Sequence, residues 1–279
     1  MIEKSGTFRL GDKTIHRLGF GAMRITGPGI WGDPPDVDEA RAVLRRAVEL
    51  GIDFIDTADS YGPEVSERLI GETLAPYPPQ LLIATKGGLI RPGPDRWVPN
   101  GHPAHLKKAC EGSLRRLRLE RIELYQFHRP DPKVPIEDSL GALVELRQEG
   151  KIAHVGVSNF TVEQLERAVA ITPIVSVQNR YNVSDRSSEP VLRWCERKGI
   201  GFIPWAPIKW EPQADGTLRS IAEKHGATPH QVALAWLLRR SPVMLPIPGT
   251  SSVRHLESNV AAAAVRLADD EVRALDALG

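Results

Sequence analysis

The chain has 279 residues, of which 41% are hydrophobic and 25% are charged, with a formal net charge of +1. This balance is typical of a globular protein, and a nearly neutral chain gives no electrostatic reason to expect binding to nucleic acid or to an acidic membrane. No signal-peptide core and no run near the ~18 apolar residues of a membrane span is present, so we expect a cytoplasmic protein. Cys110 and Cys195 lie outside any metal-binding spacing, so neither a disulfide framework nor a metal site is expected.

The elements expected along the chain alternate between strand and helix. Gly11-Asp12 separates two short alternating runs within residues 7–17, which predicts a hairpin. Eight apolar runs then predict strands, nearly all followed by a run of helical periodicity. The predicted strands are 18–22, 53–56, 81–85, 122–127, 152–157, 174–177, 201–204 and 243–247. The predicted helices are 37–50, 64–75, 106–117, 136–149, one that begins at Thr161, 188–198, 215–225, 229–240, 252–264 and 269–278, and residues 87–103 are expected to form a loop.

These strands are apolar along their whole length, which indicates a parallel sheet covered on both faces. Eight of them favour an α/β fold, a (β/α)8 TIM barrel, which typically takes about 250 residues. The hairpin is expected to plug the bottom of the barrel, and extra helices follow at the C-terminus. A doubly wound open sheet is the alternative, but no Gly-x-Gly-x-x-Gly follows the first strand. No linker divides the chain, so one domain over 1–279 is predicted.

Polar or aromatic residues lie at the C-terminal ends of six of the predicted strands. In a barrel these ends converge on one face, and active sites are built there. We therefore expect a single site at this face. The strand-end residues are Asp56, Lys86, His128, Ser158 with Asn159, Gln178, and Trp205.

Tyr61 follows Asp56 after a short polar turn and suggests a mechanism. The pKa of a tyrosine is ordinarily about 10, and a buried ammonium beside it favours the phenolate and lowers that pKa. Lys86 is the candidate ammonium, and Asp56 is expected to hold it charged, so that Tyr61 can serve as a general acid. His128 can donate to the same substrate oxygen or relay the proton. The set contains no activated nucleophile, so we expect a hydride from a nicotinamide.

The remaining strand-end residues suit such a cofactor. Ser158, Asn159 and Gln178 carry the groups needed to hold a carboxamide. Trp205 offers a flat face on which the nicotinamide ring can stack.

Five stretches of the chain, in this order, resemble the aldo-keto reductase family. They are GFGAM at 19–23, DFIDTA at 53–58, LYQFHRPD at 124–131, GVSNF at 156–160 and IPGTSS at 247–252. The resemblance runs from about residue 7 to the end and identifies Asp56, Tyr61, Lys86 and His128 with the family's catalytic tetrad. The Gly27-Pro28-Gly29 loop and the Gly-Thr-Ser-Ser stretch are most similar to bacterial members related to pyridoxal reductase.

The resemblance implies reduction of aldehydes or ketones by NADPH, with hydride passing to the carbonyl carbon and Tyr61 protonating the oxygen. It implies a dinucleotide lying across the barrel mouth, with its pyrophosphate near 205–209 and its adenosine 2′-phosphate near 249–259. The cofactor contacts it implies are Met23, Asp56, Ser158, Asn159, Gln178, Trp205, Pro207, Gly249, Thr250, Ser251, Arg254, His255 and Asn259. Trp31 and Trp97, in predicted loops after strand ends, are candidates for the substrate pocket.

The sequence departs from the family pattern at the expected 2′-phosphate site. Many relatives carry a lysine at the position of Gly249 and an arginine at that of His255. Here Thr250 and Ser251 at a helix start, with Arg254 or His255, have to serve. NADPH is therefore the expected cofactor and NADH a possible one. The alternative function is that of a regulatory NADPH-binding protein of the channel β-subunit type, with slow turnover and a protein partner.

Overall fold

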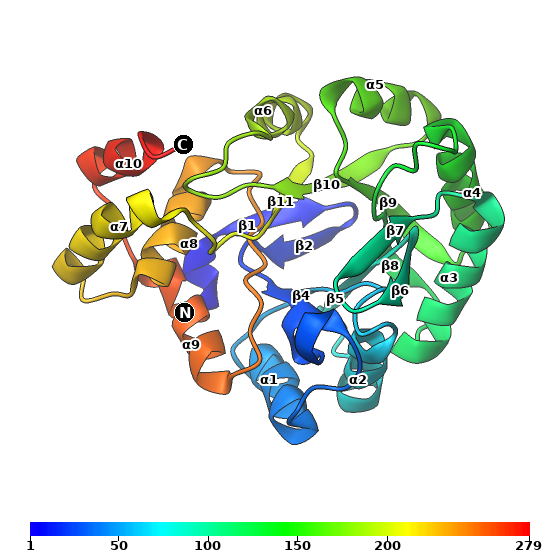
Figure 1. The fold of residues 1–279 in the computed structure, drawn as a ribbon, viewed down its shortest axis with the longest axis horizontal. Helices are drawn as coiled ribbons and strands as arrows, with labels where there is room; N and C mark the ends of the chain where they lie inside the picture. Colours follow the sequence, from blue (N-terminus) through cyan, green and yellow to red (C-terminus); the bar gives the residue numbers. More distant parts are fainter.

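The computed structural model describes all 279 residues, and its strands lie at the centre of a surrounding set of helices (Figure 1). The main sheet has seven parallel strands in the order β11-β10-β9-β8-β5-β4-β3. These strands are β3 Phe20–Gly21, β4 Phe54–Asp56, β5 Leu82–Gly87, β8 Ile122–Phe127, β9 Ile152–Ser158, β10 Ile174–Arg180 and β11 Gly201–Trp205. The sheet is parallel, as the apolar runs predicted.

All ten predicted helices are present, most of them within a few residues of the expected bounds. They are α1 Val37–Glu49, α2 Val65–Leu74, α3 Pro103–Leu117, α4 Ile136–Gln148, α5 Val162–Ile171, α6 Glu189–Lys198, α7 Pro212–Lys224, α8 Pro229–Arg240, α9 Val253–Ala261 and α10 Asp269–Asp276. Local sequence signals set the N-termini of two of these helices, since Thr161 and Thr228 form capping boxes at the starts of α5 and α8. None of these helices is both long and apolar enough to cross a membrane.

The segment 243–247, predicted as the eighth strand, is not a strand in the structure and makes only an isolated bridge to Phe202. It still bonds to both edges of the sheet. The Leu245 N–H donates to the Phe202 carbonyl at 2.8 Å, and the Gly19 N–H donates to the Pro246 carbonyl at 2.9 Å. Because proline has no N–H, Pro246 interrupts the ladder of a regular strand. The segment therefore bridges β11 and β3, an arrangement consistent with an α/β barrel.

Alternate strand residues pack into two separate apolar clusters, as the two-residue period of a strand requires. The inner cluster is enclosed by the curled sheet and contains Leu10, Ile15, Phe54, Leu82, Ala84, Leu124, Ile203, Leu245 and Ile247. The hairpin of β1 (Thr7–Leu10) and β2 (Lys13–His16) supplies Leu10 and Ile15, so it covers the end at which the strands begin. The outer cluster, with residues such as Ile55 and Tyr125, joins the sheet to the helices.

Residues 87–103, predicted to be a loop, contain an antiparallel hairpin of β6 (Leu89–Gly93) and β7 (Arg96–Pro99). The run of Pro92, Gly93 and Pro94 suggested a break in regular structure, but the register shifts between Ile90 and Gly93 and so accommodates it. The hairpin leaves the sheet directly after β5. This places it beside the ends of the strands that carry the predicted site residues.

Candidate active site

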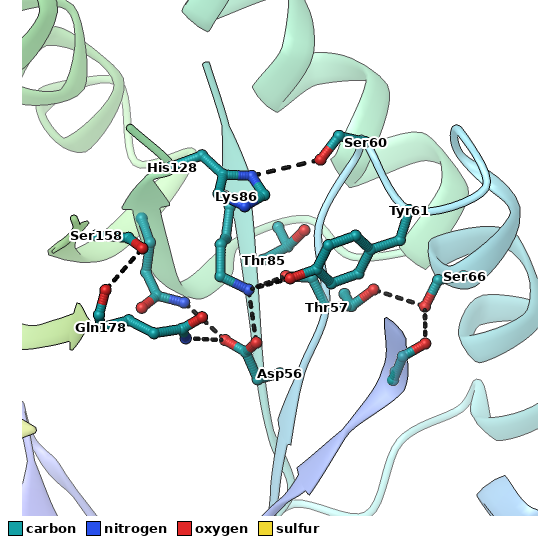
Figure 2. Close-up of polar contacts among 12 residues, drawn as sticks. Asp56, Thr57, Ser60, Tyr61, Ser66, Thr85, Lys86, His128, Ser158 and Gln178 are labelled. Carbon is teal, nitrogen blue, oxygen red and sulfur yellow. Dashed lines mark hydrogen bonds and ion pairs between the residues drawn. The ribbon is translucent and has the colours of Figure 1, made fainter. Parts of the chain in front are cut away.

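The centre of the site is the ammonium of Lys86, which projects from β5 and is fully buried. Its Nζ lies 2.5 Å from Asp56 Oδ1, 2.9 Å from the Thr57 carbonyl oxygen and 3.3 Å from the Tyr61 hydroxyl (Figure 2). The three ammonium hydrogens therefore have three acceptors. A buried charge is tolerated only when it is paired and hydrogen-bonded, and Asp56 meets that condition for Lys86.

The second oxygen of the Asp56 carboxylate is held by two glutamines. Gln126 Nε2 donates to Asp56 Oδ2 at 2.8 Å, and Gln178 Nε2 donates to the same atom at 3.0 Å. Gln126 was not predicted as a site residue. The strand period could have found it, because Leu124, Gln126 and His128 alternate along one face and Leu124 lies in the inner cluster.

Lys86 and Tyr61 are both protonated near neutral pH, but for different reasons. Burial opposes the charge of Lys86, but Asp56 and Tyr61 outweigh it and the pKa of Lys86 is raised. For Tyr61, burial is the largest influence, and it raises the pKa of the phenol although Lys86 acts in the opposite direction. The sequence-based expectation of a lowered Tyr61 pKa is thus wrong, because burial of the phenol outweighs the effect of Lys86.

His128 follows β8 and is 8% exposed. Its Nδ1 lies 3.3 Å from Ser60 Oγ, and its ring meets the Tyr61 ring edge-on with 5.9 Å between centroids. Burial, with the positive charges of Lys86, Arg129 and Arg91, holds the pKa of His128 well below its usual value of 6.5. The imidazole is therefore neutral near pH 7 and can donate one hydrogen bond into the site.

This depressed pKa predicts how stability depends on pH. The unfolded chain binds a proton at His128 below about pH 6.5, whereas the folded chain resists it. The contribution to the free energy of unfolding is thus fully present above pH 6.5 and declines as the pH falls below that value. We expect His128→Gln to make the loss of stability between pH 7 and pH 5 shallower, as measured by urea unfolding. A slope for His128→Gln equal to that of the unmodified protein would contradict the assignment.

Asp56, Tyr61 and His128 line a pocket of about 760 Å³, while Lys86 lies outside its lining. A pocket of this volume is within the range of small-molecule sites. Of the predicted cofactor and substrate contacts, the lining includes Met23, Ser158, Asn159, Gln178, Trp205, Pro207, Gly249 and Trp97. It leaves out Trp31, Thr250, Ser251, Arg254, His255 and Asn259.

The polar residues expected to hold a carboxamide are bonded to one another. Ser158 Oγ donates to the Gln178 carbonyl at 2.8 Å, and Asn159 Nδ2 donates to the His128 carbonyl at 3.0 Å. Trp205 Nε1 donates to Asn159 Oδ1 at 3.1 Å. Asn159 has a φ of 61°, a left-handed conformation that asparagine tolerates better than most residues. These bonds place the four side chains along one wall of the pocket.

The segment that leads away from the pocket begins at Gly249. A Cβ at this position would lie 2.7 Å from the Gly21 carbonyl oxygen, so the close approach of the two backbones favours glycine here. Helix α9 then starts after Ser252, and its Val253 N–H donates to Glu39 Oε1 at 3.0 Å. Of the residues predicted near the 2′-phosphate, Ser251, Arg254 and His255 are exposed, and Thr250 and Asn259 are buried.

The two predicted substrate residues lie in different positions. Trp97, on β7, contacts Tyr61 edge-on with 6.2 Å between ring centroids and lines the pocket. Trp31 lies outside the lining and is bridged to Gly62 through the backbone. Arg91, on β6, was not predicted as a residue of the site, because a lone arginine in an apparent loop gives no sequence signal.

Comparison with known proteins agrees with this arrangement. The model of the aldo/keto reductase family matches residues 17–210 and 208–279. An uncharacterized oxidoreductase of Schizosaccharomyces pombe is 50% identical over 278 residues, 99% of this chain and 90% of that protein. Pyridoxine 4-dehydrogenase of Escherichia coli is 43% identical over 282 residues, 98% of each chain. The crystal structure of an aldo-keto reductase from Klebsiella pneumoniae in complex with NADPH is 27% identical, with a TM-score of 0.83 over 98% of this chain and 94% of that one.

The family match covers nearly the whole chain, and two relatives share more than two-fifths of its residues. The chain therefore belongs to the aldo/keto reductase family and is an oxidoreductase.

Proposed function

We propose that this enzyme reduces aldehydes or ketones to alcohols with NADPH, and that Tyr61 is the general acid. The observation that carries the proposal is the buried Lys86 ammonium, held by Asp56 at 2.5 Å and lying 3.3 Å from the Tyr61 hydroxyl. An acid is useful only if it is protonated before the reaction. The raised pKa of Tyr61 meets that need, and Lys86 lies where it would stabilise the phenolate that forms after the proton has left.

The cofactor, when bound, supplies a hydride to the carbonyl carbon. The residues of the chain act on the carbonyl oxygen, on which negative charge develops. The Tyr61 hydroxyl donates a hydrogen bond to this oxygen and then transfers its proton. His128, neutral near pH 7, can donate a second hydrogen bond to the same oxygen. Asp56 keeps Lys86 charged throughout, with both of its own oxygens held by donors.

The chain has groups of the right chemistry to hold a dinucleotide. Ser158, Asn159 and Trp205 line one wall of the pocket and offer amide, hydroxyl and aromatic surfaces for a nicotinamide. Gly249 opens the segment along which the adenosine half is expected to lie. The Klebsiella pneumoniae relative, crystallised with NADPH, supports this cofactor for the present chain.

Glu39 is expected to weaken the preference for NADPH over NADH. Its carboxylate already bonds to the start of α9, beside the residues expected to face the 2′-phosphate, and a like charge repels that phosphate. We expect Glu39→Gln to raise the ratio of kcat/KM with NADPH to that with NADH by about two- to fivefold. Asp38→Asn removes a charge from the same turn and is the control. If both variants change the ratio equally, the carboxylate at α9 is not the cause.

The experiment that tests the proposed function follows the loss of reduced nicotinamide with pyridoxal, methylglyoxal, 4-nitrobenzaldehyde and a simple ketone. Each compound is tested with NADPH and with NADH. Turnover with NADPH supports the proposal, and a pronounced preference for pyridoxal would relate the substrate to that of the Escherichia coli relative, whose name is pyridoxine 4-dehydrogenase. Binding of NADPH without reduction of any carbonyl would overturn it in favour of the regulatory alternative.

A further inference from the structure

Arg91, on the β6–β7 hairpin, donates hydrogen bonds to four backbone carbonyls. Its Nη1 lies 2.9 Å from the Ser60 carbonyl and 3.0 Å from the Ile30 carbonyl, and its Nη2 lies 2.9 Å from that of Gly29. Its Nε lies 2.9 Å from the Arg96 carbonyl on the facing strand. Arg91 thus connects three segments that are far apart in the sequence: the hairpin, the turn at 28–30 and the turn that carries Tyr61.

The same guanidinium lies against two tryptophans. Its central carbon is 3.6 Å from the ring centroid of Trp97 and 5.7 Å from that of Trp31. Trp97 in turn meets Tyr61 at 6.2 Å and His128 at 6.5 Å between ring centroids. Because the guanidinium covers Trp97, the indole cannot rotate without losing a cation–π contact, and its position relative to the two catalytic rings is fixed.

Ser60 links Arg91 to both catalytic rings. Its carbonyl accepts from Arg91, it directly precedes Tyr61, and its hydroxyl lies 3.3 Å from His128 Nδ1. One arginine therefore holds an aromatic wall of the pocket and the turn behind the general acid in a fixed mutual position. The lining around Trp97 includes the apolar residues Ile30 and Leu89, and also Asp95 from the turn of the same hairpin.

We propose that Arg91 is a positioning residue that sets substrate specificity, because it holds Trp97 opposite Tyr61 and His128 so that a flat aromatic carbonyl compound is aligned for reaction. This inference rests on the proposed carbonyl reduction and adds to it the class of substrate and the residue that selects it. A small aliphatic carbonyl compound has no flat ring to lie against Trp97, so its reaction depends less on Arg91. Alignment errors of about 1 Å can reduce a rate about 100-fold, which sets the scale of the expected effect.

Arginine is the only side chain that can make all of these contacts. Its planar guanidinium has five donors in a fixed fork and can stack on an aromatic ring, whereas lysine has a compact ammonium and three donors. Arg91→Lys therefore keeps the positive charge and loses the planar fork of donors. Arg91→Met keeps the aliphatic stem and loses both the charge and the donors. Arg96 is an exposed arginine on the facing strand, and its side chain makes no hydrogen bond or ion pair, so Arg96→Met is the matched control.

The test compares kcat/KM for 4-nitrobenzaldehyde with kcat/KM for methylglyoxal, at saturating NADPH, in the unmodified enzyme and the three variants. We expect Arg91→Met and Arg91→Lys to lower the value for 4-nitrobenzaldehyde about 10- to 100-fold and that for methylglyoxal less than threefold. Arg96→Met should change neither value. The affinity for NADPH, followed by quenching of tryptophan fluorescence, should stay within twofold in all variants.

A second measurement separates this inference from the proposed activity. Calorimetric titration with 4-nitrobenzyl alcohol in the presence of NADPH, a pair that contains no hydride acceptor, reports aromatic binding without turnover, and we expect about a tenfold loss of affinity in Arg91→Met. If the unmodified enzyme reduces no carbonyl, the proposed activity fails, while this loss of binding still supports the role of Arg91. Equal losses for both aldehydes, or an Arg91→Met variant that behaves like Arg96→Met, would overturn the inference.

Discussion

Replacing Tyr61 with phenylalanine is expected to lower kcat/KM for carbonyl reduction by about 10²- to 10⁴-fold, the range for loss of a general acid. The change removes only the hydroxyl, which lies 3.3 Å from the Lys86 ammonium. The ring remains and keeps its edge-on contacts with Trp97 and His128. Binding of NADPH, measured by fluorescence titration, should therefore stay within a factor of two while steady-state turnover is lost.

Tyr125 provides the matched control for this substitution. It is a fully buried tyrosine on β8, and it belongs to the outer cluster between sheet and helices, away from the pocket. Its hydroxyl makes only a long contact of 3.5 Å to the Leu106 carbonyl. Tyr125→Phe should retain nearly full activity. Unchanged turnover in Tyr61→Phe would show that the proton comes from another group, and His128 would then be the first candidate.

The strand ends could be predicted from the sequence because strand geometry and polarity agree there. In β4, Phe54 lies in the inner apolar cluster and Asp56, two residues later, lies in the site. The same spacing relates Ala84 to Lys86 in β5. Each polar residue continues an inward-facing apolar row, so an apolar run that ends in a charged residue marks the floor of the pocket.

Other features could not be predicted because they depend on contacts between distant segments. The four carbonyls that bind Arg91 come from the facing strand and two distant turns, and no local pattern marks them as acceptors. The raised pKa of Tyr61 depends on how deeply the phenol is buried, which the residue types around it do not give. Segment 243–248 is hydrophobic enough for a buried strand. Its prolines, however, lack the backbone N–H groups that a regular ladder of hydrogen bonds needs.

Replacing Lys86 with methionine is expected to affect stability and activity together. The substitution leaves the Asp56 carboxylate buried without its cation, and breaking a buried ion pair from one side costs about 3–5 kcal/mol in the free energy of unfolding. Activity should fall by at least about 10²-fold, because no charge remains to stabilise the phenolate of Tyr61. Urea unfolding and steady-state kinetics measure the two effects on the same sample.

The pH dependence of this loss follows from the raised pKa of Lys86. A raised folded-state pKa means that the contribution of Lys86 to stability is fully present below the ordinary lysine value of 10.5 and is lost only as the pH rises through the folded-state value. The difference in the free energy of unfolding between Lys86→Met and the unmodified enzyme should thus be equal at pH 7 and pH 9. A difference that shrinks between these two values would place the pKa of Lys86 below its ordinary value instead.

A double substitution separates the effect of the buried charge on stability from its effect on catalysis. Asp56→Asn combined with Lys86→Met removes both charges and keeps an acceptor for Gln126 or Gln178. Because the uncompensated charge is gone, we expect the double variant to recover about 2 kcal/mol or more of the stability that Lys86→Met loses. It should recover no activity, since Tyr61 still lacks its ammonium. A double variant as unstable as the single one would show that packing around the lysine stem, and not the unpaired Asp56 carboxylate, accounts for the lost stability.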